Sequence, residues 1–222
     1  SFTRTTLWLF REKLAQAGLI DKLFDRFDRH LDAKGYIARG GQMVDATIVP
    51  APKPRNTREE NEALKRGETP PHGKSLFGYK NHVNVDRRHM LIRRYTVTDA
   101  AEHDSRQLDG LLRRGNTSRD VFGDSAYRSA AAEAQLTAQG FRSRIHVCAT
   151  RGHPLSKARA AANRVKSRIR ARIEHVFGAQ ETAPGGRLVR TIGIVRARAK
   201  IGLQNFVYNV RRLVTLERMA AA

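Results

Sequence analysis

Met43-Val-Asp-Ala-Thr-Ile-Val49 is an apolar, β-branched run interrupted by a single carboxylate, Asp45. Such a run predicts a buried strand. Gly40-Gly41 precedes it, and three prolines interrupt the chain after it, so both ends of the strand are marked. Burying a carboxylate is costly without a cation or hydrogen-bond donors. Asp45 is therefore a candidate ligand, with a strand-end turn residue as the alternative.

Regular elements are predicted on both sides of this strand. Upstream, apolar residues at helical spacing indicate a helical hairpin over 6–35. Downstream we expect a polar loop over 52–76, strands at 78–85, 90–98, 120–123 and 144–148, and helices at 104–115, 129–139, 157–180 and 197–219. This order matches the ribonuclease-H-like plan. It is an α/β fold with a mixed five-stranded sheet flanked by helices, here preceded by a helical hairpin.

The composition indicates a polyanionic partner. The chain has 222 residues, with 42 Lys and Arg against 21 Asp and Glu, for a formal net charge of +21. Charge alone favours a nucleic-acid-coating protein and a nucleic-acid enzyme equally. A hydrophobic content of 40% suits one main domain. No apolar stretch is long enough for a membrane span, so we expect no membrane association and a cytoplasmic location.

Two further carboxylates occur in settings that suit phosphoryl-transfer chemistry. Asp124 lies in Val121-Phe-Gly-Asp-Ser-Ala-Tyr127, and Glu174 lies in Arg170-Ala-Arg-Ile-Glu-His175. Mg²⁺ prefers carboxylate oxygens, and two such ions can stabilise both oxygens of an in-line displacement. The alternatives are a helix cap for Asp124 and an ordinary helical salt bridge between Arg170 and Glu174.

These motifs together resemble the bacterial insertion-sequence DDE transposases, in particular the group typified by insertion sequence five. The resemblance covers nearly the whole chain, and the three acids have the compact spacing of members without an insertion domain. The other matching motifs are Gly78-Tyr-Lys80, His103-Asp-Ser105, Asn163-Arg164, Ser167-Arg168 and Asn205 to Asn209.

The resemblance implies both a site and an activity. In this fold the first and fourth strands are neighbours, so Asp45 and Asp124 would meet, and Glu174 would complete a catalytic site that binds two Mg²⁺ or Mn²⁺ ions. The implied enzyme is a DDE transposase that cleaves the ends of an insertion sequence and joins them to target DNA. Double-stranded DNA is the implied partner, bound by a homodimer in the bacterial nucleoid.

The resemblance also assigns segments and supporting residues. It divides the chain into a partial N-terminal helical region, 1–40, and a catalytic domain, 41–219. His103 and Asp104 would support the metal ligands, or else cap a helix. The residues expected to bind DNA are Arg164, Arg168, Arg170, Arg172 and Lys80, although a basic helix face is also commonly just solvated. The expected apolar stripe of the same helix is Val165, Ile169, Ile173 and Val176.

Some features depart from the family pattern. Ser167 and Glu181 stand where members often have a tyrosine and a lysine, and the family's N-terminal region normally begins upstream of Thr5. The sequence thus resembles a truncated copy or one part of a longer product. Two alternative functions remain open: a ribonuclease-H-like nuclease without strand transfer, and a catalytically defective remnant that only binds DNA.

Overall fold

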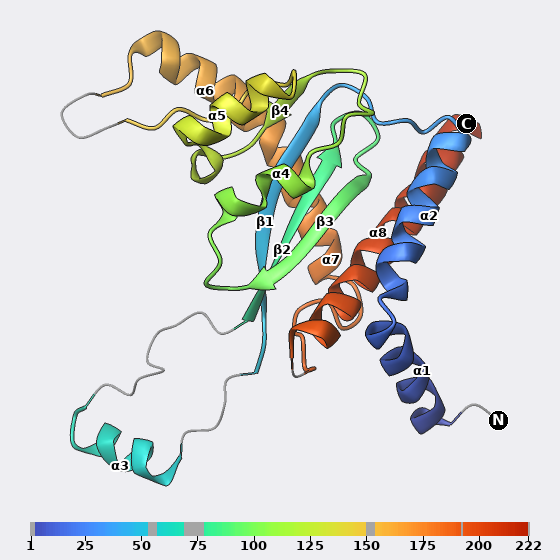
Figure 1. The fold of residues 1–222 in the computed structure, drawn as a ribbon, viewed down its shortest axis with the longest axis vertical. Helices are drawn as coiled ribbons and strands as arrows, with labels where there is room; N and C mark the ends of the chain where they lie inside the picture. Colours follow the sequence, from blue (N-terminus) through green and yellow to red (C-terminus); the bar gives the residue numbers. More distant parts are fainter. Residues whose placement is uncertain (1–2, 53–56, 69–77, 150–153, 192, 222) are drawn as a thin grey trace.

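A computed structural model describes residues 3–52, 57–68, 78–149, 154–191 and 193–221. Its centre is a mixed five-stranded sheet with the order β3-β2-β1-β4-β5 (Figure 1). The central strand β1 pairs antiparallel with β2 and parallel with β4. The strands are β1 Gln42–Pro50, β2 Gly78–Asp86, β3 Ile92–Asp99, β4 Asp120–Phe122 and β5 Arg142–Ser143. The predicted α/β class, the mixed sheet and the adjacency of the first and fourth strands are confirmed.

Helices cover both faces of the sheet. They are α1 Arg4–Gln16, α2 Leu19–Ala33, α4 Leu108–Leu111, α5 Ala130–Ala138, α6 Lys157–Arg170, α7 Glu174–Glu181 and α8 Ile194–Ala221, with 3₁₀ turns η1 Asp104–Gln107, η2 Ser125–Tyr127 and η3 Ala171–Ile173. Met43 of β1 packs in one core with side chains of α2, η3 and α7, whereas its neighbour Val44 packs with α4 and α5. Since successive strand residues face opposite sides, Asp45 lies on the α7 side of the sheet, with Met43.

The two predicted N-terminal helices are present, but the predicted hairpin is wrong, because α1 and α2 follow one another along α8 and do not fold back on each other (Figure 1). Helix α2 is tied to the sheet. Phe24 of α2 enters the core beneath α7. Arg93 of β3 donates to Asp86 of β2 at 2.9 Å and to Asp28 of α2 at 3.0 Å. Arg113 also pairs with Asp28 and with Asp32. A mostly buried ion-pair network therefore joins α2 to the edge of the sheet.

Helix α8 lies along the edge strand β3. The side chain of Asn209 accepts from the Ile92 backbone N–H at 2.9 Å and donates to the Ile92 carbonyl at 2.7 Å. Arg198 donates to the Val97 carbonyl at 3.2 Å. The long helix thus satisfies backbone groups of β3 that no strand pairs with.

The predicted loop over 52–76 and the predicted fifth strand are partly wrong. The expected loop over 52–76 contains a helix, α3 Arg58–Lys65, begun by a capping box in which Thr57 and Glu60 bond each other's backbone N–H. Residues 53–56 and 69–76 of that loop lie outside the described residues. The fifth strand is β5 at 142–143, not 144–148. Beyond it, the Arg144 and His146 N–H groups still donate to carbonyls of Val121 and Gly123.

The predicted helix over 157–180 is divided by η3, and its apolar stripe is partly wrong. Helix α6 has no buried residue, and Val165 is 60% exposed. Its inner face is polar: Asn163 bonds both backbone groups of Val147, and Lys166 donates to the Ile145 carbonyl. The helix expected over 104–115 is also shorter, since η1 and α4 end at Leu111.

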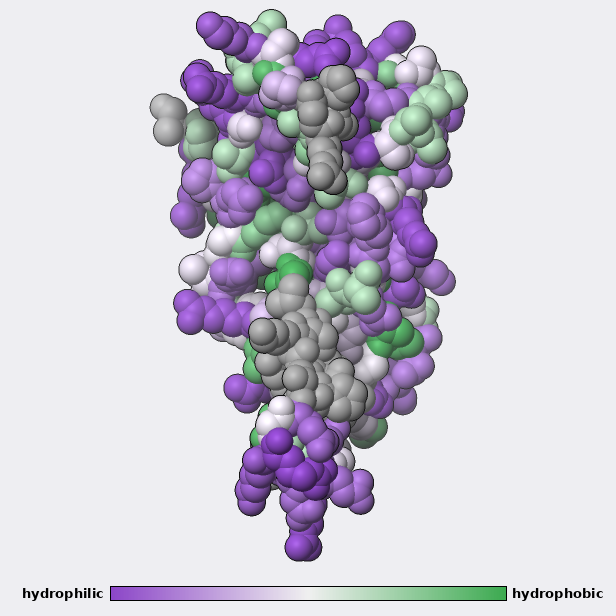
Figure 2. All heavy atoms as spheres, turned by 90° about the vertical axis from the view of Figure 1, so that its left-hand side faces the viewer, coloured by the Kyte–Doolittle hydropathy of each residue, from purple (hydrophilic) through white to green (hydrophobic). Residues whose placement is uncertain are grey.

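The surface is strongly polar. Figure 2 shows hydrophilic side chains over most of one face, including the end that carries α5 and α6. Among the described residues, no helix combines the length and apolar character needed to span a membrane.

Candidate active site

Asp45 is a buried carboxylate held by two donors. It lies on the central strand and is 7% exposed. One oxygen, Oδ1, accepts from the Ala46 backbone N–H at 2.9 Å, and Oδ2 accepts from Arg170 Nη1 at 2.7 Å. Arg170 is the last residue of α6, so this ion pair connects the central strand to the helix that leads to Glu174.

The surroundings of Asp45 disfavour its charge. Burial is the main cause that raises the pKa of Asp45 to about 6, and the nearby charges of Asp124 and Glu174 raise it further. Arg170 and the Ala46 N–H act in the opposite direction and do not fully compensate. Asp45 therefore lies within electrostatic range of both Asp124 and Glu174.

Asp124 and Glu174 approach this place from different elements. Asp124 follows β4 by two positions beyond Phe122, whose side chain packs on the α7 side of the sheet. The Asp124 Oδ1 accepts from the Ala126 N–H at 2.8 Å, so Asp124 also caps η2. A helix cap was the alternative role predicted for Asp124. Glu174 begins α7 and is exposed. The alternative Arg170–Glu174 salt bridge is not formed, because Arg170 pairs with Asp45.

The donor chemistry fits a divalent cation. Three carboxylates offer the hard oxygen ligands that Mg²⁺ and Mn²⁺ prefer. The Tyr127 hydroxyl and Arg170 Nε are buried without a hydrogen-bond partner, and the pKa of Tyr127 is raised by burial and by the charges of Asp45, Asp104 and Asp124. In the described residues, no group of three or more His, Cys, Asp or Glu side chains is already arranged to hold a metal ion.

Lys80, His103 and Asp104 belong to a separate cluster. Lys80 donates to the Glu102 carbonyl at 2.7 Å and to Asp104 at 3.0 Å, so its ammonium group is engaged within the protein. His103 accepts from the Ser105 N–H and caps η1. On β2, Lys80 shares a face with His82, opposite to that of Val83, which packs beside α7. This cluster therefore lies on the α4 side.

Sequence reasoning missed His82. It is fully buried, bonds Thr98 Oγ1 at 2.8 Å and lies 3.9 Å from Asp104. Burial lowers the pKa of His82 to about 4, so the ring is neutral at physiological pH. The only available signal was a polar pair, Asn81-His82, inside an otherwise strand-like run.

The arginines of the basic helix are available for a ligand. Arg164, Arg168 and Arg172 are exposed. Within the described part of the chain, none of the three has an ion-pair partner. Arg170 differs from them, because its guanidinium group is engaged by Asp45.

Comparison with known proteins identifies the family. A family model described as a transposase DDE domain matches residues 38–210, which include all three carboxylates. A solved cryo-EM structure of the piggyBac transposase synaptic complex with hairpin DNA is similar at 8% identity and a TM-score of 0.45. The match covers 80% of this chain and 48% of that one, so this chain spans about half of that transposase's length. Because the family model matches well over half of the chain, the protein belongs to the transposase DDE domain family.

Proposed function

We propose that this protein is the catalytic transposase of a bacterial insertion sequence, of the group typified by insertion sequence five. Asp45, Asp124 and Glu174 would bind two Mg²⁺ or Mn²⁺ ions and process the ends of the element. The observation that carries the proposal is the buried carboxylate of Asp45 on the central strand, paired with Arg170 and within electrostatic range of Asp124 and Glu174, in a chain of net charge +21.

Bound metal would activate water and neutralise charge on the phosphate oxygens that attack and leave. The protein's own residues supply the framework. Asp45 is fixed on the central strand by Ala46 and Arg170, Asp124 is fixed by its cap on η2, and Glu174 begins α7. Arg170 offsets part of the negative charge of Asp45.

Exposed arginines would hold the DNA. Arg164 and Arg168 are free of acidic partners within the described residues and lie on α6, which η3 connects to Glu174 at the start of α7. Phosphate contacts of this kind supply affinity without sequence preference. We also propose that the protein acts as a homodimer on DNA, and that its catalytic domain begins near residue 41 after a helical region at 1–40.

Replacing Asp124 with Asn tests the proposal. Asp124→Asn should bind DNA as well as the parent, because lysine and arginine supply the affinity, and it should lose Mg²⁺-dependent cleavage. The matched control is Asp109→Asn, an exposed aspartate of α4 that bonds Gln139 and should leave cleavage unchanged. Cleavage by Asp124→Asn at the parental rate would falsify the site assignment.

Two assays separate the alternatives. Joining of a 3′-OH donor end into plasmid DNA distinguishes a transposase from a nuclease that only cuts. Binding without metal-dependent cleavage by the parent identifies a remnant that has lost catalysis.

A further inference from the structure

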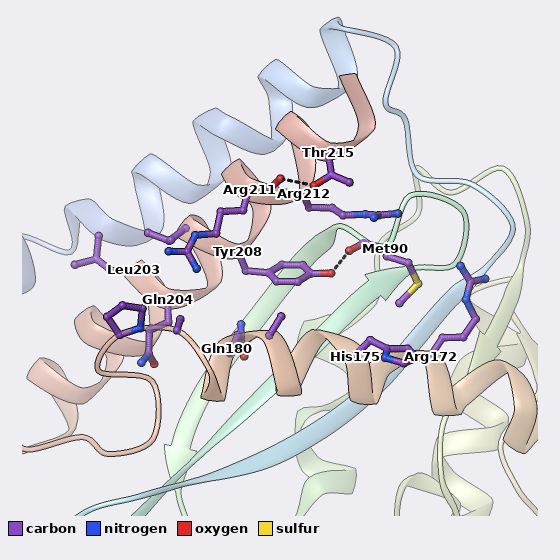
Figure 3. A pocket seen from close by; sticks show the side chains of 14 residues that line it. Met90, Arg172, His175, Gln180, Leu203, Gln204, Tyr208, Arg211, Arg212 and Thr215 are labelled. Carbon is purple, nitrogen blue, oxygen red and sulfur yellow. Dashed lines mark hydrogen bonds between the residues drawn. The ribbon is translucent and has the colours of Figure 1, made fainter. Parts of the chain in front are cut away.

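A groove of about 650 Å³ lies between α7 and α8 (Figure 3). Its floor is largely apolar and includes Leu203, Val207 and the ring of Tyr208, whose hydroxyl donates to the Met90 carbonyl at 2.7 Å. The volume falls within the range of small-molecule and cofactor sites. The roles proposed for the three carboxylates and for the exposed arginines of α6 leave this groove without a function.

The rim of the groove is cationic. Arg172 comes from η3, and Arg211 and Arg212 come from α8, with His175 close to Arg172 (Figure 3). Arg212 donates to the His89 carbonyl at 2.7 Å, which fixes its side chain. Arg172 and Arg211 have no acidic partner among the described residues. No described residue that lines the groove is an Asp or a Glu, so a bound anion would meet no repulsion there.

The groove shares a helix with the candidate catalytic glutamate. Ile173 and Val176 face the core, and Glu174 and His175 diverge on either side of that buried face. A helix with its side chains is about 10 to 12 Å across. A nucleic acid that reaches Glu174 can therefore also reach the groove without bending far.

We propose that this groove binds an unpaired segment of DNA next to the bond being cut. The inference rests on the proposed DNA-processing function and adds to it a second subsite. A DNA duplex presents phosphates on its outside and keeps its base faces stacked inside, so it would leave the apolar floor of the groove uncovered. An unpaired strand presents both phosphates and base faces, which suit arginines around apolar and aromatic side chains.

Binding of matched oligonucleotides tests the inference without metal and without cleavage. Two fluorescent probes are compared, a blunt duplex and the same duplex with a short single-stranded tail. The tail should raise the affinity of the parent by about tenfold, typical of one stacked base. In Arg172→Ala/Arg211→Ala that gain should disappear, and the salt slope of tailed-probe binding should fall by up to about 1.4, from about 0.7 per single-strand phosphate contact.

Control variants separate this groove from general charge. Arg164→Ala/Arg168→Ala removes the same charge from α6 and should weaken both probes while preserving the tail's gain. Lys22→Ala/Arg26→Ala removes the same charge from exposed positions of α2 and should also preserve the affinity gain from the tail. A tail of abasic sites should recover only part of the gain, because the apolar floor then has no base to cover it.

Two outcomes overturn the inference. They are a parent with no preference for the tailed probe, and a folded groove variant that keeps the full preference. Circular dichroism checks folding, and Arg172→Gln/Arg211→Gln provides a second variant that keeps polar side chains. Failure of the proposed function would appear elsewhere, as parental cleavage by Asp124→Asn, and would leave this binding comparison unchanged.

Discussion

At the scale of single residues, Asp45 and Arg170 form the most informative pair. A motif in the sequence singles out the aspartate, but only the fold shows that its counter-charge is an arginine distant in sequence. The arginine belongs to the group predicted to contact DNA. Its place beside Asp45 gives it a different position from Arg164 and Arg168, which are exposed.

Asp45 should make stability depend on pH in an unusual direction. Burial raises its pKa from an ordinary value of 3.8 to about 6, so the folded protein binds this proton more tightly than the unfolded chain does. The contribution of Asp45 to the free energy of unfolding is fully present below about pH 4 and is lost as the pH rises through 6. Asp45→Asn should therefore be more stable than the parent near pH 7.5, by up to about 3 kcal/mol, and similar to it near pH 4.

Urea denaturation of both proteins at the two pH values measures this difference. His82, whose pKa is lowered to about 4 by burial, destabilises the fold toward acid pH, but equally in both proteins, so the comparison at each pH removes its effect. A difference that does not grow between pH 4 and pH 7.5 would show that Asp45 is not the group responsible.

At the scale of elements, the helix before Glu174 behaves differently from its sequence pattern. Period 3.6 predicted one continuous helix with a buried stripe that includes Val165. The structure tightens the three residues of η3, and a 3₁₀ turn advances about 20° more per residue than an α-helix. Arg172, the second residue of η3, is therefore rotated by up to about 40° from the line of Arg164 and Arg168 and faces the groove instead.

The arginines of α6 should control the electrostatic part of DNA binding. Arg164→Ala/Arg168→Ala should reduce the dependence of log affinity on log salt by up to about 1.8 for duplex DNA, at about 0.9 per phosphate contact. Anisotropy titrations at several salt concentrations measure the slope. An unchanged slope in a folded variant would mean that α6 is only a solvated face.

In the assembled fold, an ion-pair network joins the N-terminal helix α2 to the sheet. Arg93 is 2% exposed and bonds both the buried Asp86 and Asp28. Arg93→Met should destabilise the protein by about 3 to 5 kcal/mol, because Asp86 is left buried without its cation. Arg106→Met, which breaks an exposed pair with Glu102, should cost about 0.5 kcal/mol or less.

Urea denaturation followed by circular dichroism measures both variants. The predicted loss is expected in one cooperative transition, since Phe24 of α2 shares a core with β1 and α7. A loss for Arg93→Met no greater than that for Arg106→Met would mean that the network adds little to the fold.

The sequence predicted the sheet and the three acids because both are local signals. The β-branched run of β1, the Gly-Asp step after β4 and the order of elements are readable in short windows. The groove, the Arg170–Asp45 pair and the network around Arg93 depend on residues far apart in sequence, so no window contains them. The helix α3 was readable from Thr57 and Glu60, but its polar composition favoured a loop.

The contacts between α8 and β3 have a consequence for solubility during folding. A free edge strand invites pairing with a strand of another molecule, which leads to aggregation. Asn209 bonds both backbone groups of Ile92, and Arg198 bonds the Val97 carbonyl. Helix α8 therefore occupies backbone groups of β3 that would otherwise be open to a further strand. The opposite edge, β5, has two residues and offers little to pair with. Asn209→Leu should therefore reopen one edge and make the protein prone to forming intermolecular β-structure.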